Sequence, residues 1–227
     1  KRRQKTNRLC LNRKTVILLK KMKRIVLLLA LQISFSQSEH KRVLEGFNEL
    51  KVYNGIMVIL KKSNRNFVEI FGENQESVRV VNRSGIIKLK MKLSKKFKRE
   101  NTTVNIEHKS PVFLIESQQG SEIIIRDTIN QTTVYFKTSS GGQISAVINV
   151  KKTRSTSSTG GIIQLTGKTI SLEAKARSGG VVKAATLISE QTKASASLGG
   201  VCGAFANEVF EASASFGGEV SVYGDPK

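Results

Sequence analysis

Residues 174–184 read AKARSGGVVKA, and two later segments repeat this pattern, ASASLGGVCGA at 194–204 and ASASFGGEVSV at 212–222. In each segment small apolar residues alternate with polar residues, a Gly-Gly pair follows, and a second alternation begins. Alternation with a period of two is typical of a half-buried β-strand. Each segment therefore predicts a strand, a glycine turn and another strand.

Gly-Gly pairs recur through the second half of the chain at a nearly constant spacing. Their first glycines are Gly141, Gly160, Gly179, Gly199 and Gly217, so the successive intervals are 19, 19, 20 and 18 residues. A fixed period near 20 residues is the mark of a solenoid. We expect this glycine column to form one corner, where the chain turns with positive φ. A larger side chain there is also expected to collide with the coils above and below.

Alignment on the glycines gives columns of similar residues. Three residues after each first glycine stand Ile144, Ile163, Val182, Cys202 and Val220, and the next position is mostly polar. These columns predict a parallel β-helix, in which coils stack about 4.8 Å apart with their apolar columns inside. The segment TRSTSST at 153–159 breaks the pattern and predicts a weaker register there. A β-sandwich is the alternative, although its strands have no reason to repeat in columns.

Residues 47–118 carry longer alternating runs with larger apolar residues, such as KVYNGIMVIL at 51–60 and IIKLKMKL at 86–93. These runs predict a more irregular β-strand region ahead of the repeat region at 119–227. No segment after residue 36 has the apolar spacing of an amphipathic helix. The expected fold is therefore all-β, with repeats of about 19 residues after an irregular β region.

The first 36 residues have a composition of their own, with 11 of the 38 Lys and Arg residues and no acid. A basic start at Met22, an apolar run at 25–31 and the small residues that follow predict a secretory signal peptide at 22–36. Residues 1–21 are interpreted as translated upstream sequence, and 37–46 as a flexible start of the mature chain. The apolar run is shorter than a membrane span, so no stable transmembrane segment is expected in the mature chain.

Cysteine usage indicates the compartment. Cys202 is the only cysteine after residue 36, so the exported part has no internal disulfide. Export without disulfides suits the bacterial envelope better than a eukaryotic secreted module. We therefore expect a location in the periplasm or at the cell surface of a Gram-negative bacterium.

Several short motifs resemble the putative auto-transporter adhesin, head GIN domain family. They are FNELKVYNGIMVILKK at 47–62, SGIIKL at 84–89, SPVFL at 110–114, the Gly-Gly repeats and the ending VSVYGDPK at 220–227. One departure is Met57, where the family pattern has Asn. The resemblance covers residues 43–227 and implies a right-handed β-helix in an exported, Bacteroidetes-type envelope or surface protein. It supplies no catalytic residues.

Residues suited to catalysis or metal binding are few. His40 and His108 are the only histidines, and no Cys/His cluster has metal-ligand spacing. His108, beside Ser110, is interpreted as a solvent-facing strand residue rather than part of a catalytic triad. Cys202 falls in an inward column and is interpreted as a buried apolar residue.

Clustered carboxylates, which some β-helical enzymes use, are also not indicated. Glu173 and Glu211 share one column of the repeat, but Lys193 lies between them. An ion-pair ladder is the simpler interpretation, because two coils separate the carboxylates more widely than glycosidase pairs require. We therefore expect no enzyme, no metal and no cofactor.

A basic run at 88–99, KLKMKLSKKFKR, has seven basic residues in twelve. The candidate contacts for an anionic ligand are Lys88, Lys90, Lys92, Lys95, Lys96, Lys98 and Arg99. Alternate lysines of a strand project from one face, where they could bind acidic glycans, lipopolysaccharide phosphates or an anionic membrane. Alternatively, the lysines only protect a strand edge from aggregation. Nucleic acid is not expected, because export and the lack of an aromatic stripe oppose it.

The leading hypothesis is an exported, non-enzymatic β-helical adhesin or binding protein of the cell envelope, with an acidic glycan or another envelope component as its ligand. One alternative is a passive scaffold that self-associates through uncapped coils. A β-helical carbohydrate-active enzyme is the other alternative.

Overall fold

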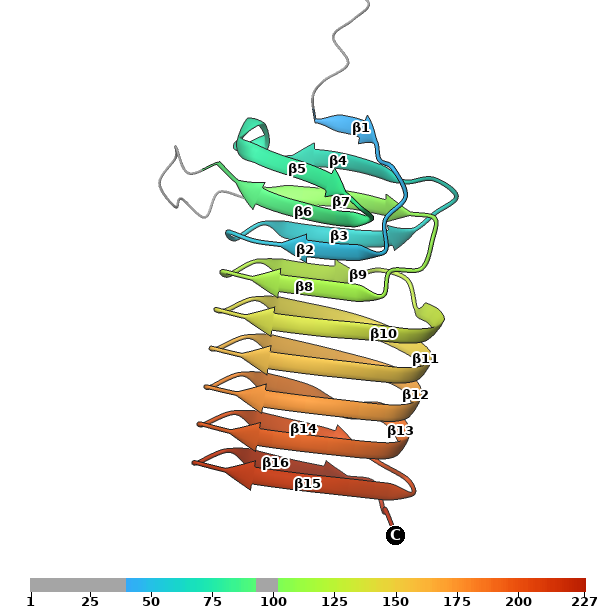
Figure 1. Cartoon of the computed structure of the whole chain (residues 1–227), viewed down its shortest axis with the longest axis vertical. Helices are drawn as coiled ribbons and strands as arrows, with labels where there is room; N and C mark the ends of the chain where they lie inside the picture. Colours follow the sequence, from blue (N-terminus) through green and yellow to red (C-terminus); the bar gives the residue numbers. More distant parts are fainter. Residues whose placement is uncertain (1–39, 93–101) are drawn as a thin grey trace, which may run out of the picture. The chain divides into compact units, whose positions relative to one another are not determined.

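The structure is a computed structural model that describes residues 40–92 and 102–227, and residues Glu39–Lys227 form one compact unit. Within the described ranges the regular elements are β-strands and one short 3-10 turn, η2 (Gln75–Ser77), with no α-helix. Hydrogen bonds join the strands into one sixteen-stranded sheet, which winds into a solenoid (Figure 1). The all-β prediction is confirmed.

Each coil of the solenoid runs along one face of the core and returns along the other. The strands on these two faces are called the back sheet and the front sheet, as seen in Figure 1. The strands of the repeat region are β10 (Ile129–Ser139), β11 (Gln143–Ser158), β12 (Ile162–Arg177), β13 (Val181–Ser197), β14 (Val201–Phe205), β15 (Val209–Ser215) and β16 (Glu219–Tyr223). β11, β12 and β13 each begin after a Gly-Gly turn, run along the back sheet, bend, and return along the front sheet of Figure 1. Neighbouring coils pair in parallel, and the chain descends as a right-handed helix. The right-handed parallel β-helix is therefore confirmed.

The apolar columns point inward as the repeat alignment predicts. Ile144, Ile163, Val182 and Cys202 are successive register partners on the back sheet, and all of them are buried. Ala174 and Ala194 are register partners in a buried column of the front sheet. The predicted placement of Cys202 inside the solenoid is thus confirmed.

The segment 153–159 does not weaken the register, contrary to expectation. β11 pairs with β12 along its whole length without a shift, and Thr153, Ser155 and Ser157 point inward and are fully buried. The Thr153 hydroxyl donates to the carbonyl of Val134 at 3.0 Å, and the Ser157 hydroxyl donates to a carbonyl of the following turn at 2.6 Å. Backbone carbonyls thus satisfy the hydroxyls of Thr153 and Ser157, whereas the buried Ser155 hydroxyl has no hydrogen-bond partner among the described residues. Small polar residues can therefore replace alkyl groups inside the coil where a carbonyl lies within reach.

A register shift occurs in β13 instead. Gln164 pairs with Lys183 and Thr166 pairs with Thr186, so β13 holds one residue more than β12 over this interval. An extra residue of this kind is a β-bulge. It accounts for the 20-residue interval that follows Gly179, where the two preceding intervals have 19 residues.

The predicted glycine column forms the corner seen at the left edge of Figure 1. Both residues of each turn have positive φ, for example +49° at Ser178 and +72° at Gly179. A backbone hydrogen bond closes this corner, because the Gly180 amide donates to the Arg177 carbonyl at 2.9 Å. Successive turns also bond to one another, since the Gly179 amide donates to the Leu198 carbonyl at 3.1 Å.

The collision expected between coils falls on the second glycine of each pair and not on the first. A Cβ at Gly179 would meet no described atom within 4 Å, and the same holds at Gly160 and Gly199. A Cβ at Gly180 would lie 2.5 Å from the carbonyl carbon and oxygen of Ser157 in the preceding coil. Backbone conformation therefore requires the first glycine, and the close approach of two backbones requires the second.

The N-terminal region starts the same stack. Its parallel strands are β2 (Glu49–Val52), β3 (Met57–Lys62), β6 (Ile86–Met91), β7 (Thr103–His108), β8 (Leu114–Gln118) and β9 (Glu122–Ile125). β2 lies between β6 and β8 in the front sheet, and β3 lies between β7 and β9 in the back sheet. The boundary that the sequence predicts at 118/119 falls at the turn between β8 and β9.

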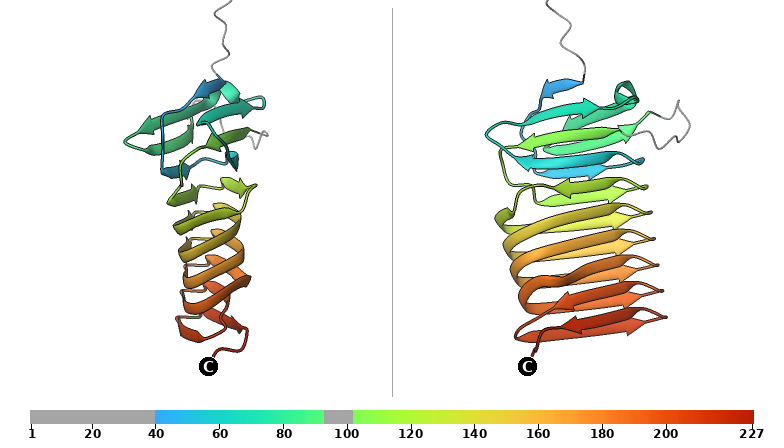
Figure 2. Two further views of the ribbon diagram at one scale, coloured as in Figure 1. Left: turned by 90° about the vertical axis from the view of Figure 1, so that its right-hand side faces the viewer. Right: turned by 180° about the vertical axis from the view of Figure 1, so that it is seen from behind.

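Antiparallel strands complete this end of the stack. They are β1 (Lys41–Val43), β4 (Phe67–Phe71) and β5 (Val78–Arg83). β4 pairs with β7, β1 pairs with β4, and β5 pairs with β6. Figure 2 shows that the two sheets spread apart here into a curled, mixed sheet. Larger buried side chains, such as Leu50, Ile56 and Ile87, occupy the core of this part.

Candidate binding surface

The predicted anionic-ligand contacts that the structure describes lie on the outer face of the front sheet. Lys88 and Lys90 belong to β6, Lys92 follows its last residue, and all three are exposed, while Leu89 between them is buried. The predicted contacts Lys95, Lys96, Lys98 and Arg99 lie outside the described residues. β6 is not an edge strand, because β2 pairs with one side and β5 with the other.

Two arginines of β5 join these lysines through a hairpin that the sequence reasoning missed. Ser84 and Gly85 have φ of +50° and +76°, so they form a type I′ turn that folds β5 back on β6. Arg79 is then the direct cross-strand partner of Lys90, and Arg83, two positions beyond the partner of Lys88, is also exposed. The Ser-Gly pair between two alternating runs was the signal that could have revealed the hairpin.

We define the basic patch as Arg79, Lys88, Lys90 and Lys92. Within the described part of the chain, no carboxylate lies within 4 Å of these four side chains. Like charges directly opposite each other in a sheet destabilise it. Arg79 and Lys90 therefore repel each other, and a bound anion would reduce this repulsion.

The neighbouring strand β2 adds a further cation and an aromatic ring. Lys51 is the register partner of Lys88, but Glu49 neutralises it at 3.1 Å, and this hydrogen bond raises the pKa of Lys51. Tyr53 lies beside Lys90, whose ammonium stands 4.9 Å from the centre of the ring. The sequence reasoning did not single out Tyr53, because its position beside Lys90 depends on the pairing of β2 with β6.

The same outer face continues down the solenoid as a charged column. Arg154 donates to Glu173 at 2.6 Å, Lys175 pairs with Glu173 at 2.6 Å, and Lys193 pairs with Glu211 at 2.6 Å. Hydrogen bonds from Lys175 and then Arg154 lower the pKa of Glu173. The predicted ion-pair ladder is confirmed in part, because Lys193 pairs with Glu211 while Glu173 pairs with Arg154 and Lys175.

The histidine and cysteine that the sequence singled out are packed into the protein. His108 is not solvent-facing as expected: it is half-buried, and its ring contacts Phe47 edge-on with centroids 6.4 Å apart. Its Nδ1 bonds the Ser110 carbonyl at 2.8 Å and not a hydroxyl, and burial lowers the pKa of His108. Burial also raises the pKa of the free Cys202 thiol to about 12. Neither residue is arranged as a nucleophile or a base.

The described residues are 40–92 and 102–227. No group of three or more His, Cys, Asp or Glu side chains in these ranges is placed to hold a metal ion. No helix in the same ranges has both the length and the apolar character that crossing a bilayer demands.

The fold is shared with solved bacterial structures. A crystal structure described as a putative adhesin from Bacteroides fragilis matches with a TM-score of 0.71 and 14% identity, over 82% of this chain and 92% of that chain. A putative adhesin from Parabacteroides distasonis matches with a TM-score of 0.63, 14% identity and coverage of 82% and 89%. A structure described as a putative lipid binding protein from the same species matches with a TM-score of 0.59, 12% identity and coverage of 82% and 90%.

These identities are low, so the three structures show the common fold alone. No curated protein matches the chain. Residues 46–226 match the family described as "putative auto-transporter adhesin, head GIN domain", which covers most of the chain and agrees with the resemblance seen in the sequence. That description implies export, and the family has no known catalytic role. The chain therefore belongs to the putative auto-transporter adhesin, head GIN domain family.

Proposed function

We propose that this protein is an exported, non-enzymatic adhesion module of the envelope of a Gram-negative bacterium, which binds a polyanion through the basic patch. The observation that carries the proposal is the pairing of Arg79 with Lys90 and the exposure of Lys88 and Lys92 on the same face. Lys137, Arg154 and Lys193 on the same sheet have carboxylate partners, whereas the four patch cations leave their charge available to a ligand.

Protection of a strand edge is the competing explanation of the lysines. An edge-protecting charge acts on a strand that has a free side. β6 is paired on both sides, so Lys88 and Lys90 cannot serve that purpose, and only Arg79 and Arg83 on β5 can. Ligand binding accounts for all members of the patch together.

The test compares two variants of equal charge. Arg79→Gln/Lys88→Gln/Lys90→Gln removes three of the four patch cations, and Lys151→Gln/Lys152→Gln/Lys168→Gln removes three exposed lysines near the bend of the solenoid. Binding to immobilised dextran sulfate is measured over a series of salt concentrations. We expect the patch variant to lose affinity by about tenfold or more and to show a shallower salt dependence. Equal loss in both variants would mean that net charge alone drives binding, and would refute the patch.

Export rests on the segment at 22–36, which lies outside the described residues and stays a predicted signal peptide. If it is cleaved as proposed, N-terminal sequencing of the protein from its native host begins at Gln37. Recovery of intact residues 1–36 in a cytosolic fraction would contradict the envelope location.

A self-assembling scaffold is the second candidate function, and the last coil supplies the observation that favours it. Ala212 and Ala214 continue the inward columns of Ala194 and Ala196 but are exposed, and Phe216 at the turn is 82% exposed. Sedimentation velocity over a wide concentration range separates the two candidates. Association that Ala214→Lys abolishes would favour the scaffold, and a monomer at every concentration would exclude it.

A further inference from the structure

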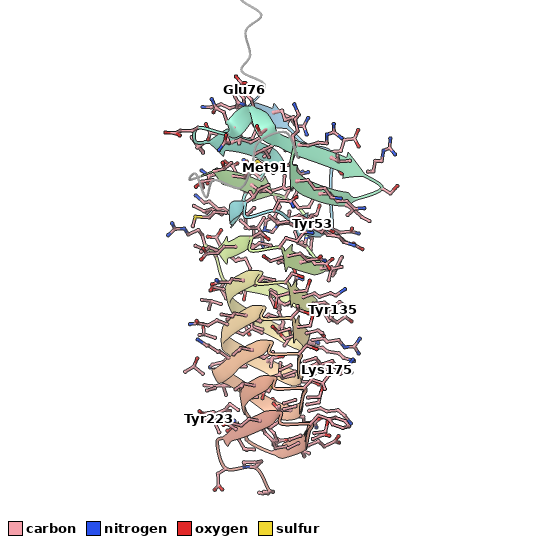
Figure 3. The ribbon with its side chains drawn as sticks, turned by 90° about the vertical axis from the view of Figure 1, so that its left-hand side faces the viewer. Tyr53, Glu76, Met91, Tyr135, Lys175 and Tyr223 are labelled. Carbon is pink, nitrogen blue, oxygen red and sulfur yellow. The ribbon has the colours of Figure 1, made fainter. Side chains whose placement is uncertain are left out.

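The outer face of the front sheet presents two tyrosines, one on each side of a group of charged residues. Tyr53 follows β2, and Tyr135, 36% exposed, lies on β10, with β8 between them. Figure 3 shows both rings along one side of the solenoid, with Tyr223 on the opposite side. A cation accompanies each ring: Lys90 stands 4.9 Å from the Tyr53 centroid, and Arg154 stands 5.8 Å from the Tyr135 centroid.

The register fixes how far apart the Cα atoms of the two tyrosines lie. Tyr135 shares a column with Glu49, and Tyr53 is four residues further along β2. Two strand spacings and four residues amount to about 10 Å across and about 13 Å along the strands, a separation of about 16 Å. Both tyrosines lie on one face of the sheet about 16 Å apart, so a ligand that contacts both must be elongated.

The floor between the rings is polar. Glu116 contacts Lys137 at 3.4 Å and Lys51 at 3.9 Å, and Gln118 donates to the same carboxylate at 2.5 Å. These side chains hold one another in place, and their donors and acceptors can form hydrogen bonds with the hydroxyl groups of a ligand. The basic patch borders this floor on the side of Tyr53.

We propose that the ligand of the patch is an acidic polysaccharide whose sugar rings stack on Tyr53 and Tyr135; this inference rests on the proposed polyanion binding. An acidic polysaccharide combines apolar ring faces, hydroxyl groups and anionic groups in one elongated chain. The ring faces meet the tyrosines, the hydroxyls meet the polar floor, and the carboxylates or sulfates meet Arg79, Lys88 and Lys90. A polyphosphate or a lipid headgroup uses the cations but leaves the rings without a partner.

Lys90 links the two parts of the site. In the free protein its ammonium covers the Tyr53 ring. A charge-assisted hydrogen bond to a ligand carboxylate is stronger than a cation–π contact at an exposed site. Binding of the anion therefore draws Lys90 off the ring and opens the ring face to the sugar.

The experiment uses two probes, polygalacturonate and inorganic polyphosphate, at equal ionic strength with the full chain. The variants are Tyr53→Leu, Tyr135→Leu and the control Tyr223→Leu, a tyrosine of similar exposure on the other face. We expect each of the first two to weaken polygalacturonate binding by about threefold to tenfold, the range given by aromatic contacts. Polyphosphate binding should be unchanged in all three, and Tyr223→Leu should behave as the wild type toward both probes.

The outcomes separate this inference from the proposed function. Equal effects on both probes, or none, would overturn stacking, and an effect at only one tyrosine would overturn the extended platform. In each of these cases the proposal of polyanion binding still stands if the variant that lacks three patch cations loses affinity for both probes. If that variant binds both probes as the wild type does, the proposed function itself fails. Unchanged urea midpoints of the tyrosine variants show that folding is not the cause.

Discussion

The two glycines of each corner are expected to respond differently to the same added methyl group. At Gly180 a Cβ would lie 2.5 Å from the carbonyl group of Ser157 and 2.7 Å from the next amide nitrogen, where ordinary contact begins at 3.4 Å. The coils must therefore separate locally by about 0.9 Å, the difference between 3.4 and 2.5 Å. That shift strains hydrogen bonds between them such as Val181 to Gly161 at 2.8 Å. Overpacking at about 1–3 kcal/mol and one or two weakened bonds at about 1 kcal/mol each give a cost of about 3 kcal/mol for Gly180→Ala.

Gly179→Ala adds the same methyl group one residue earlier, where it meets no described atom within 4 Å. Its cost is conformational, because φ is +72°, and a residue with a Cβ pays about 1–2 kcal/mol there. Both substitutions reduce the entropy of the unfolded chain equally, so that contribution cancels in the comparison. Urea unfolding followed by circular dichroism gives both values at a common m-value. Ser195→Val on the outer face is the control and should change stability by less than about 0.5 kcal/mol. A cost at Gly179 equal to or above that at Gly180 would refute the contact that we assign to the second glycine.

Three further predictions concern titratable and charged groups. Cys202 should resist thiol reagents in the folded protein and react once unfolded, because its thiol is buried with a pKa of about 12; rapid labelling of the folded protein would contradict its inward position. The pKa of His108 is lowered on folding, so its contribution to the free energy of unfolding is complete above pH 6.5, its ordinary pKa, and declines as the pH falls through that value; denaturant melts should show this decline in the wild type and not in His108→Gln. Glu173→Gln, which leaves two cations unpaired, should cost about 1 kcal/mol at low salt and less at high salt, whereas Glu211→Gln at the more exposed end of the ladder should have no detectable effect in the same melts.

The repeat region was the part of the fold that the sequence determined most completely. The inward position of Cys202 follows from period-two alternation together with the glycine spacing, since each column has an equivalent residue in every coil. The same pattern gave a wrong prediction at Thr153 and Ser157, where a weaker register was expected. A polar residue is expected to point outward unless a backbone acceptor lies within reach of its hydroxyl. The position of that acceptor depends on the neighbouring coil, which the local sequence does not show.

The candidate site was predicted only in part, for a similar reason. Lys88 and Lys90 were visible as an alternating basic run, whereas their partners Arg79 and Tyr53 come from strands that meet β6 only after folding. No local pattern marks a cross-strand neighbour. The sequence did not reveal that the collision falls on the second glycine of each pair. It shows that two glycines are present, but not which of them faces another backbone.

The unshifted pairing of β11 with β12 allows the length of the solenoid to change by one whole coil. Ile162 pairs with Gln143 above it and with Val181 below it, so loss of residues 162–180 would bring Val181 beneath Gln143 with every column still aligned. Each such loss shortens the solenoid by about 4.8 Å and removes one nearest-neighbour interface, without altering its cross-section. The number of coils thus sets the distance between the basic patch and the last coil of the solenoid. This distance can change without any change in the side chains of the patch.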